Sequence, residues 1–193
     1  EYPWNNDPHL AAEVLRLQEA HGLTYAVETG TCLGSTTLWL AEHFAEVATF
    51  EIHEPFYDIA SERFDHLNIP MGRIYNEHLN SVDGLRIYAN VIGADERALY
   101  WLDAHWGDTC PLLDELEVIA QRGPAPCILI HDFQVPGTTF GFDSMPDGTP
   151  FHLELVAPYM DAIYGTNGWV VNYPTKVEGA MRGWASFAPV AKG

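Results

Sequence analysis

Short apolar runs alternate along this chain with longer segments whose apolar residues recur at helical spacing. Apolar runs bounded by turn residues are typical of buried strands, and apolar residues at i, i+3, i+4 and i+7 are typical of one helix face. Strands are therefore expected at residues 23–27, 47–52, 73–78, 98–103 and 126–130, the third being the weakest and the last the most apolar. Helices are expected at 38–44, 54–64, around 85–88 and at 111–121.

Both ends of the chain extend this alternation. Asp7-Pro8 is typical of a capped helix start and Gly22 of a helix end, which predicts a helix before the first strand. A helix is expected at 151–164, followed by an antiparallel pair of strands at 169–173 and 183–187. Residues 1–193 are thus expected to form one α/β domain, Rossmann-like, with a mainly parallel sheet and helices on both faces.

The composition of the chain limits the kinds of partner that it is expected to bind. Apolar residues make up 47% of the 193 residues, as in a globular domain. The net charge of −18 argues against nucleic acid or an anionic membrane as a partner. It favours a neutral or cationic small molecule, although high solubility or a high-salt origin explains the acidity equally well. Homo-oligomer formation is left open.

The sequence also favours a cytoplasmic location. Cys32, Cys110 and Cys127 have no paired spacing, which is typical of a reducing compartment. No apolar run approaches the roughly 20 residues of a membrane span. The first residues show no basic region followed by an apolar one, so no signal peptide is expected.

The most specific motif lies between the first strand and the helix that follows it. Glu28 ends the strand, and Gly30 and Gly34 stand in the turn. Such a turn places backbone N–H groups and the positive end of a helix beside a ligand. The absence of G-x-G-x-x-G counts against a nicotinamide cofactor. An ordinary strand-to-helix turn of another α/β protein is the alternative.

This motif resembles the first motif of the class I S-adenosylmethionine (SAM) methyltransferases. The resemblance extends over about residues 26–187. It implies that the glycine loop lies under the methionine part of SAM and that Glu28 holds the amino group directly or through water. Asn80 stands near the adenine position, where many members of the family carry an acid. The cofactor-binding residues expected in this chain are Glu28, Gly30, Thr31, Gly34, Ser35, Thr36, Glu51, Asn80, Ser81 and Asp103.

Acids and a histidine stand at the ends of several predicted strands. Glu51 ends the second strand, about 20 positions beyond the first motif, where a carboxylate suits a ribose diol. A solvent-facing acid is the alternative there. Asp103 and His131-Asp132 end the fourth and fifth strands. Because ligands bind at the carboxyl ends of such strands, one active-site crevice is expected.

The sequence predicts a cation site formed by Asp103, His131 and Asp132, because carboxylate oxygens suit hard divalent ions. Their layout resembles the metal-dependent O-methyltransferases of the catechol, macrolide-sugar and aminocoumarin-sugar types. His131 replaces an acid of that family, and imidazole favours zinc, iron, nickel or manganese over magnesium. These three residues are the expected ligands of magnesium, manganese or another divalent metal. The alternative is that the acids cap loops or bind substrate without metal.

His105 is the first candidate for the catalytic base, because a histidine near neutrality suits deprotonation of a hydroxyl. The catechol-type enzymes carry a Lys in this loop, and this chain has none there. His131 is the rival candidate. The resulting hypothesis is a SAM-dependent O-methyltransferase for a hydroxylated small molecule such as a sugar or natural product. An oxidoreductase or hydroxylase-associated protein on the same fold, or a non-catalytic SAM-binding subunit, are the alternatives.

Residues 133–150, the 133–150 loop, form a long connection rich in Gly and Pro that leaves directly from His131-Asp132. Long loops of this kind are often lids or binding loops. Phe140 and Phe142 are expected to cover an apolar part of the acceptor. A rigid surface loop whose aromatic residues pack on the sheet edge is the alternative.

Overall fold

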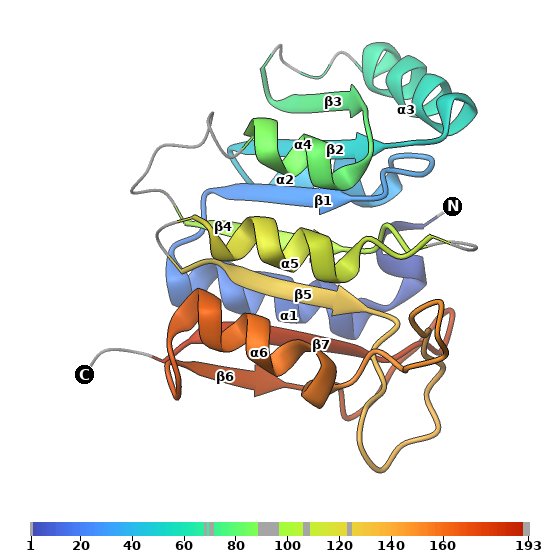
Figure 1. Cartoon of the computed structure of the whole chain (residues 1–193). Helices are drawn as coiled ribbons and strands as arrows, with labels where there is room; N and C mark the ends of the chain where they lie inside the picture. Colours follow the sequence, from blue (N-terminus) through green and yellow to red (C-terminus); the bar gives the residue numbers. More distant parts are fainter. Residues whose placement is uncertain are drawn as a thin grey trace.

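A computed structural model of the chain describes residues 2–67, 69, 72–88, 97–105, 109–122 and 125–190. Seven strands form one sheet in the order β3-β2-β1-β4-β5-β7-β6 (Figure 1). β1 to β5 run parallel, and β7 is antiparallel to both β5 and β6. The strands are β1 Tyr25–Thr29, β2 Glu46–Glu51, β3 Ile74–His78, β4 Ala98–Leu102, β5 Cys127–His131, β6 Trp169–Asn172 and β7 Trp184–Pro189.

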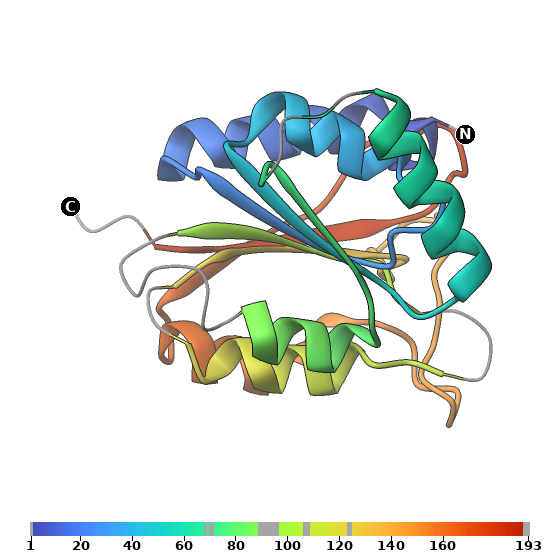
Figure 2. The ribbon, with the colours of Figure 1, turned by 90° about the horizontal axis from the view of Figure 1, so that it is seen from above.

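Helices cover both faces of the sheet (Figure 2). One face carries α1 Pro8–His21, α2 Ser35–His43 and α3 Glu54–His66, and the other carries α4 Ser81–Tyr88, α5 Leu112–Ala120 and α6 Leu153–Tyr164. Each layer encloses its own apolar core. Parallel strands buried on both faces explain why the sequence shows continuous apolar runs there.

The predicted fold class and the predicted elements are confirmed. The helix expected from residue 38 begins earlier, at Ser35, because the turn after Gly34 is already helical. β3 is the weakest strand pattern because it lies at the edge of the sheet and is only partly buried. The loop of Trp106, Gly107 and Asp108 lies outside the described residues. None of the described helices has the length and apolar character needed to cross a bilayer.

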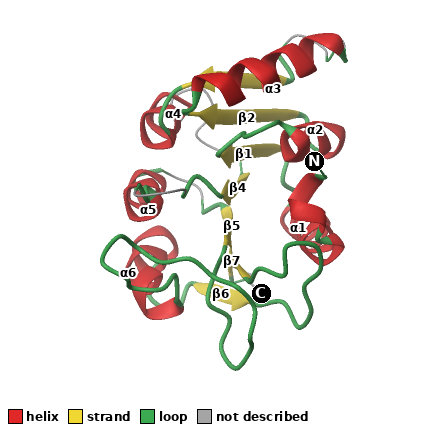
Figure 3. Ribbon diagram, turned by 90° about the vertical axis from the view of Figure 1, so that its right-hand side faces the viewer, coloured by secondary structure: helices red, strands yellow, loops and turns green. Residues whose placement is uncertain are grey.

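The parallel strands all end at one edge, which faces the viewer in Figure 3. β1 pairs with β2 on one side and with β4 on the other, so the strand order reverses between β1 and β4. In open α/β sheets such a reversal leaves a crevice outside the carboxyl ends of the strands, where ligands bind. The predicted site residues are therefore sought at this edge.

Candidate functional site

The glycine loop after β1 needs glycine at both of its predicted positions. Gly30 and Gly34 have φ values of +85° and +76°, which side chains rarely adopt. A Cβ on Gly30 would lie 2.8 Å from the carbonyl oxygen of Asp103, and one on Gly34 would lie 2.6 Å from the ring of Phe64. The ends of β1 and β4 therefore touch at Gly30, at the point where the strand order reverses.

Glu28 anchors this loop from beneath. Its side chain is 1% exposed, on the side of the sheet that α2 covers. Its Oε2 accepts hydrogen bonds from the hydroxyls of Thr37 (2.5 Å) and Thr49 (2.7 Å). The Thr49 hydroxyl also lies 2.6 Å from that of Thr31. A contact between Glu28 and the amino group of SAM stays a prediction.

Glu51 is buried at the end of β2, where it joins two neighbouring loops. Its Oε2 accepts from the backbone N–H of Cys32, and its Oε1 from that of His53, both at 2.8 Å. An ionised carboxylate has further lone pairs, so a ribose diol can still donate to it. The next residue, Ile52, is 64% exposed and offers apolar surface beside this acid.

The remaining predicted cofactor-binding residues lie at the same edge, and several of their side chains form hydrogen bonds within the protein. Three of them accept hydrogen bonds: Ser35 from the guanidinium of Arg63 (2.7 Å), Thr36 from the backbone N–H of Trp4 (3.1 Å) and Asn80 from the backbone N–H of Asp83 (2.9 Å). Asn80 thereby begins α4. Cofactor contacts from these residues stay predictions.

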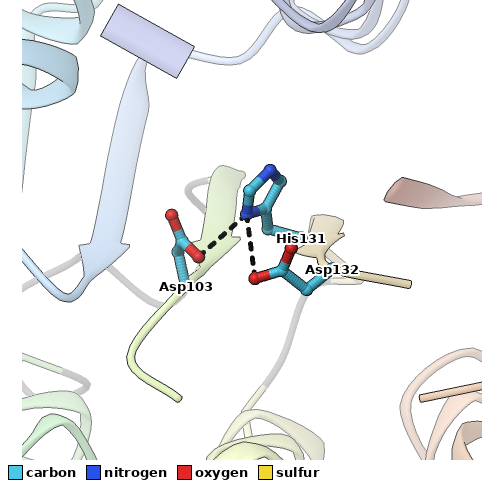
Figure 4. Close-up of side chains that lie close together, drawn as sticks. All are labelled: Asp103, His131 and Asp132. Atoms are coloured by element: carbon cyan, nitrogen blue, oxygen red, sulfur yellow. Dashed lines mark hydrogen bonds and ion pairs between the residues drawn. The ribbon is translucent and has the colours of Figure 1, made fainter. Parts of the chain in front are cut away.

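Two acids and two histidines meet at the ends of β4 and β5, and Figure 4 shows Asp103, His131 and Asp132 of this group. Nδ1 of His131 lies 3.0 Å from Oδ1 of Asp103 and 3.4 Å from Oδ2 of Asp132. Nε2 of His105 lies 3.1 Å from the same Asp132 oxygen and 3.8 Å from Asp103. The structure thus brings all four predicted residues into one centre, here called the reaction centre.

Neighbouring carboxylates determine the protonation of His131 in the reaction centre. Burial disfavours an imidazolium, but the carboxylates of Asp103 and Asp132 outweigh it and raise the pKa of His131 to about 10. Burial alone would raise the pKa of Asp132, yet hydrogen bonds from His105 and His131 hold it well below its usual range. His131 is therefore protonated at neutral pH in this arrangement and is a poor proton acceptor.

Arg182 and Asp143 complete the reaction centre, and the sequence patterns did not identify them. Nε of Arg182 donates to Oδ1 of Asp132, and its Nη2 donates to Oδ1 of Asp143. Arg182 lies 50 residues from Asp132 in the sequence, just before β7. Asp143 belongs to the 133–150 loop. No local motif surrounds either residue, so only the fold reveals the contact.

Glu115 is a third residue that the sequence patterns missed. It is 1% exposed on α5, and one carboxyl oxygen, Oε1, has no hydrogen-bond partner among the described residues. Burial raises the pKa of Glu115 to about 7, although hydrogen bonds with Ser81 and Thr29 oppose the shift. A signal was available, because Glu115 falls on the apolar stripe of Leu112, Leu116 and Ile119.

The 133–150 loop is tied to the protein at its base. The backbone N–H of Asp143 donates to the carbonyl of Asp132 (2.9 Å), and that of Gly141 donates to the carbonyl of Met181 (3.0 Å). Its tip and the start of α6 enclose a hollow of about 280 Å³. The lining includes Val135, Pro136, Phe140, Phe142, His152 and Leu153. The role of the loop as a lid stays a prediction.

The donor set at the reaction centre fits a divalent metal. Donor atoms of Asp103, His131 and Asp132 all lie within 4.8 Å of one another, and so do those of His105, Asp132 and Asp143. Carboxylate oxygens together with imidazole suit manganese or a later transition metal better than magnesium. Metal binding through His131 requires loss of its proton first.

Solved structures of known proteins share this arrangement of strands and helices. An O-methyltransferase from Bacillus cereus in complex with SAH is similar over 95% of this chain and 81% of its own, with 18% identity and a TM-score of 0.65. The O-methyltransferase TomG from Streptomyces achromogenes, in complex with SAM, is similar over 91% and 77%, with 13% identity and a TM-score of 0.59. The chain has the class I methyltransferase fold.

The methyltransferase fold also occurs in proteins described with other activities. The precorrin 8w decarboxylase from Methanobacterium thermoautotrophicum is similar over 94% of this chain and 90% of its own, with 14% identity and a TM-score of 0.58. No family model and no curated protein matches the chain. Since one fold can carry different reactions, the function has to be argued from the residues of the site.

Proposed function

We propose that this protein is a SAM-dependent O-methyltransferase that acts on a hydroxyl of a small molecule, a sugar or a natural product. The observation that carries the proposal is the meeting of the glycine loop, Glu51 and the reaction centre at the reversal of strand order. Solved proteins of the same fold described as O-methyltransferases with SAM or SAH support it, and TomG is described as acting in tomaymycin synthesis.

In this proposal the edge of β1 and β2 binds SAM. The glycine loop lets the methionine part approach the backbone closely, because no side chain stands at Gly30 and Gly34. The Glu51 carboxylate accepts hydrogen bonds from the ribose hydroxyls. Exposed Ile52 covers one face of the adenine. SAM then lies across β1 with its sulfonium toward Asp103 and the reaction centre.

His105 is the proposed base. Its Nε2 faces the Asp132 carboxylate at 3.1 Å, so Asp132 favours the tautomer with a proton on Nε2 and a lone pair on Nδ1. Nδ1 takes the proton of the acceptor hydroxyl while the hydroxyl oxygen bonds to the SAM methyl carbon. The bond from that carbon to sulfur breaks, which leaves the methyl ether and SAH. Asp132 stabilises the imidazolium that forms.

Asp103, His131 and Asp132 are the proposed ligands of a divalent metal, which when bound would lower the pKa of the acceptor hydroxyl. The residues of the chain supply the alignment of acceptor and cofactor, and such positioning accounts for much of the rate in group transfer. The net charge of −18 favours a neutral or cationic acceptor. We propose a cytoplasmic enzyme with no nucleic-acid or membrane partner.

Calorimetry with SAM and with NAD tests the cofactor. We expect SAM to bind and NAD not to bind. Glu51→Ala should weaken SAM by about 1.5–3 kcal/mol, the usual range for a hydrogen bond to a charged group. Glu54→Ala, an exposed acid of the neighbouring helix, is the matched control and should bind SAM like the wild type. Unchanged SAM affinity in Glu51→Ala would refute the cofactor site.

Methyl transfer from labelled SAM to hydroxylated acceptors tests the reaction. Turnover should fall strongly in His105→Ala and in the wild type treated with EDTA. Adding a divalent metal should restore turnover after EDTA but not in His105→Ala. SAM binding without transfer to any acceptor would favour the non-catalytic subunit. Full turnover in EDTA, with no metal found in the protein, would contradict the metal while leaving His105 as base.

A further inference from the structure

We propose that Arg182 competes with the divalent metal for Asp132, and that metal binding thereby releases the 133–150 loop from the end of β5. The proposal rests on the metal site of the proposed function. It assigns to Arg182 the role of a built-in cation that occupies Asp132 and holds the 133–150 loop until a metal replaces it.

The first argument is that Asp132 has both oxygens engaged. Its Oδ1 accepts from Nε of Arg182. Its Oδ2 lies 3.1 Å from Nε2 of His105 and 3.4 Å from Nδ1 of His131. Each carboxylate oxygen has a further lone pair, so a metal can bind Oδ1, but it then stands directly beside the guanidinium of Arg182. Arg182 is the partner that can leave most readily, because its side chain is 31% exposed while both histidines are buried.

The second argument is charge. The guanidinium of Arg182 lies between Asp132 and Asp143, and both acids belong to a group of donor atoms within 4.8 Å of one another. A divalent ion on Asp132 would stand beside this guanidinium, and like charges at such separations repel strongly in a partly buried site. Arg182 and the metal therefore exclude one another.

The third argument is that Arg182 also holds the 133–150 loop. Its Nη2 donates to Asp143, and its stem packs on Gly141, where a Cβ would approach Cδ of Arg182 to 2.9 Å. When Arg182 turns away, this side-chain clip is lost and backbone bonds alone hold the base of the loop. The loop also lines the hollow that it forms with the start of α6, so metal binding would loosen one wall of that hollow.

Titration with Mn²⁺ alone, without SAM or acceptor, tests the competition. Arg182→Ala should bind Mn²⁺ at least about tenfold more tightly than the wild type, since a competing cation has been removed. Asp143→Asn removes one of the two acids that hold Arg182 and should give a smaller gain. Arg86→Ala, which lacks an exposed cation paired with Asp83, is the control and should leave Mn²⁺ affinity unchanged.

Amide hydrogen exchange tests the release of the loop. In the wild type, Mn²⁺ should speed exchange at the amides of Gly141 and Asp143. In Arg182→Ala these amides should exchange quickly before Mn²⁺ is added. If Arg182→Ala fails to fold, the Asp143→Asn variant, changed at a half-buried position, still gives both readouts.

Equal Mn²⁺ affinity in wild type, Asp143→Asn and a folded Arg182→Ala would overturn the proposal. Slower loop exchange on adding Mn²⁺ to the wild type would overturn it as well. Either result leaves the proposed function standing if SAM binds and methyl transfer occurs. Conversely, the expected Mn²⁺ results without SAM binding would retain the competition and reject the methyltransferase.

Discussion

Seven described residues other than glycine adopt the left-handed region of φ, and one of them, Asn167, lies just before β6. The other six are Trp4, Asn5, Asn6, Cys32, Asp132 and Met181, with φ between 49° and 64°. Each such residue costs roughly 1–2 kcal/mol. They lie in the N-terminal turn, the glycine loop, the end of β5 and the segment before β7, which contact one another through Thr36, Ala180 and Gly141. Backbone strain of this kind concentrates where a structure binds or reacts.

Glu115 offers a test at the scale of one titrating group. Its pKa rises from 4.5 to about 7 on folding because the carboxyl is buried. The folded state therefore holds the proton more tightly than the unfolded state. The stability from this group is complete below pH 4.5, and it declines as the pH rises toward 7.

Glu115→Gln removes this titration while keeping the shape. Between pH 5 and pH 8 the free energy of unfolding of the variant should gain about 3 kcal/mol relative to the wild type, from about 1.4 kcal/mol per pKa unit. Urea denaturation of both proteins at the two pH values measures the difference. Comparing the two proteins cancels the titration of His131 and Asp132. A constant difference across this range would show that Glu115 is ionised in the folded protein.

At the scale of elements, the two phenylalanines of the 133–150 loop have different environments. Both line the hollow, but Phe142 is 39% exposed, whereas Phe140 is partly buried against the core beside α1 and α2. As part of an acceptor lid, Phe142→Ala should lower acceptor affinity or turnover, with SAM affinity and melting temperature nearly unchanged. Steady-state kinetics, SAM titration and thermal melting provide the three readouts.

Phe140→Ala should instead lower the melting temperature, because it removes a packed aromatic side chain. Ile87→Ala, an exposed apolar residue of α4, is a control for non-specific effects of losing surface apolar area. A loss of stability with unchanged kinetics in both loop variants would show that the loop is a rigid surface element.

The sequence predicted those features that depend on local pattern. The strands, the helices and the glycine turn follow from apolar runs, helical spacing and positions that need positive φ. The acids at the ends of β4 and β5 were found because parallel strands end at one edge. Arg182 and Asp143 could not be found, because their contact depends on how the 133–150 loop returns to the segment before β7. The buried position of Glu28 likewise depends on hydroxyls from α2 and β2.

At the scale of the whole molecule, the large negative net charge affects the stability of the folded state. A net charge of −18 makes the folded state repel itself, and salt screens that repulsion over about 10 Å at 0.1 M. Raising NaCl from low to moderate concentration at pH 7 should therefore raise the melting temperature by a few degrees. At pH 5, where protonation removes part of the negative charge, the gain should be smaller. Calorimetric scans at both pH values measure it, and a melting temperature that falls with salt would contradict the argument.

The place of β7 sets the order in which the sheet can be completed during synthesis. β7 leaves the ribosome after β6, yet it lies between β5 and β6 and is the strand to which both are bonded. Until it emerges, the apolar β5 has an open edge and β6 has no neighbour, a state that invites pairing with other chains. Arg182 arrives just ahead of β7, so the nascent chain acquires the clip on its 133–150 loop as β7 covers the open edge of β5.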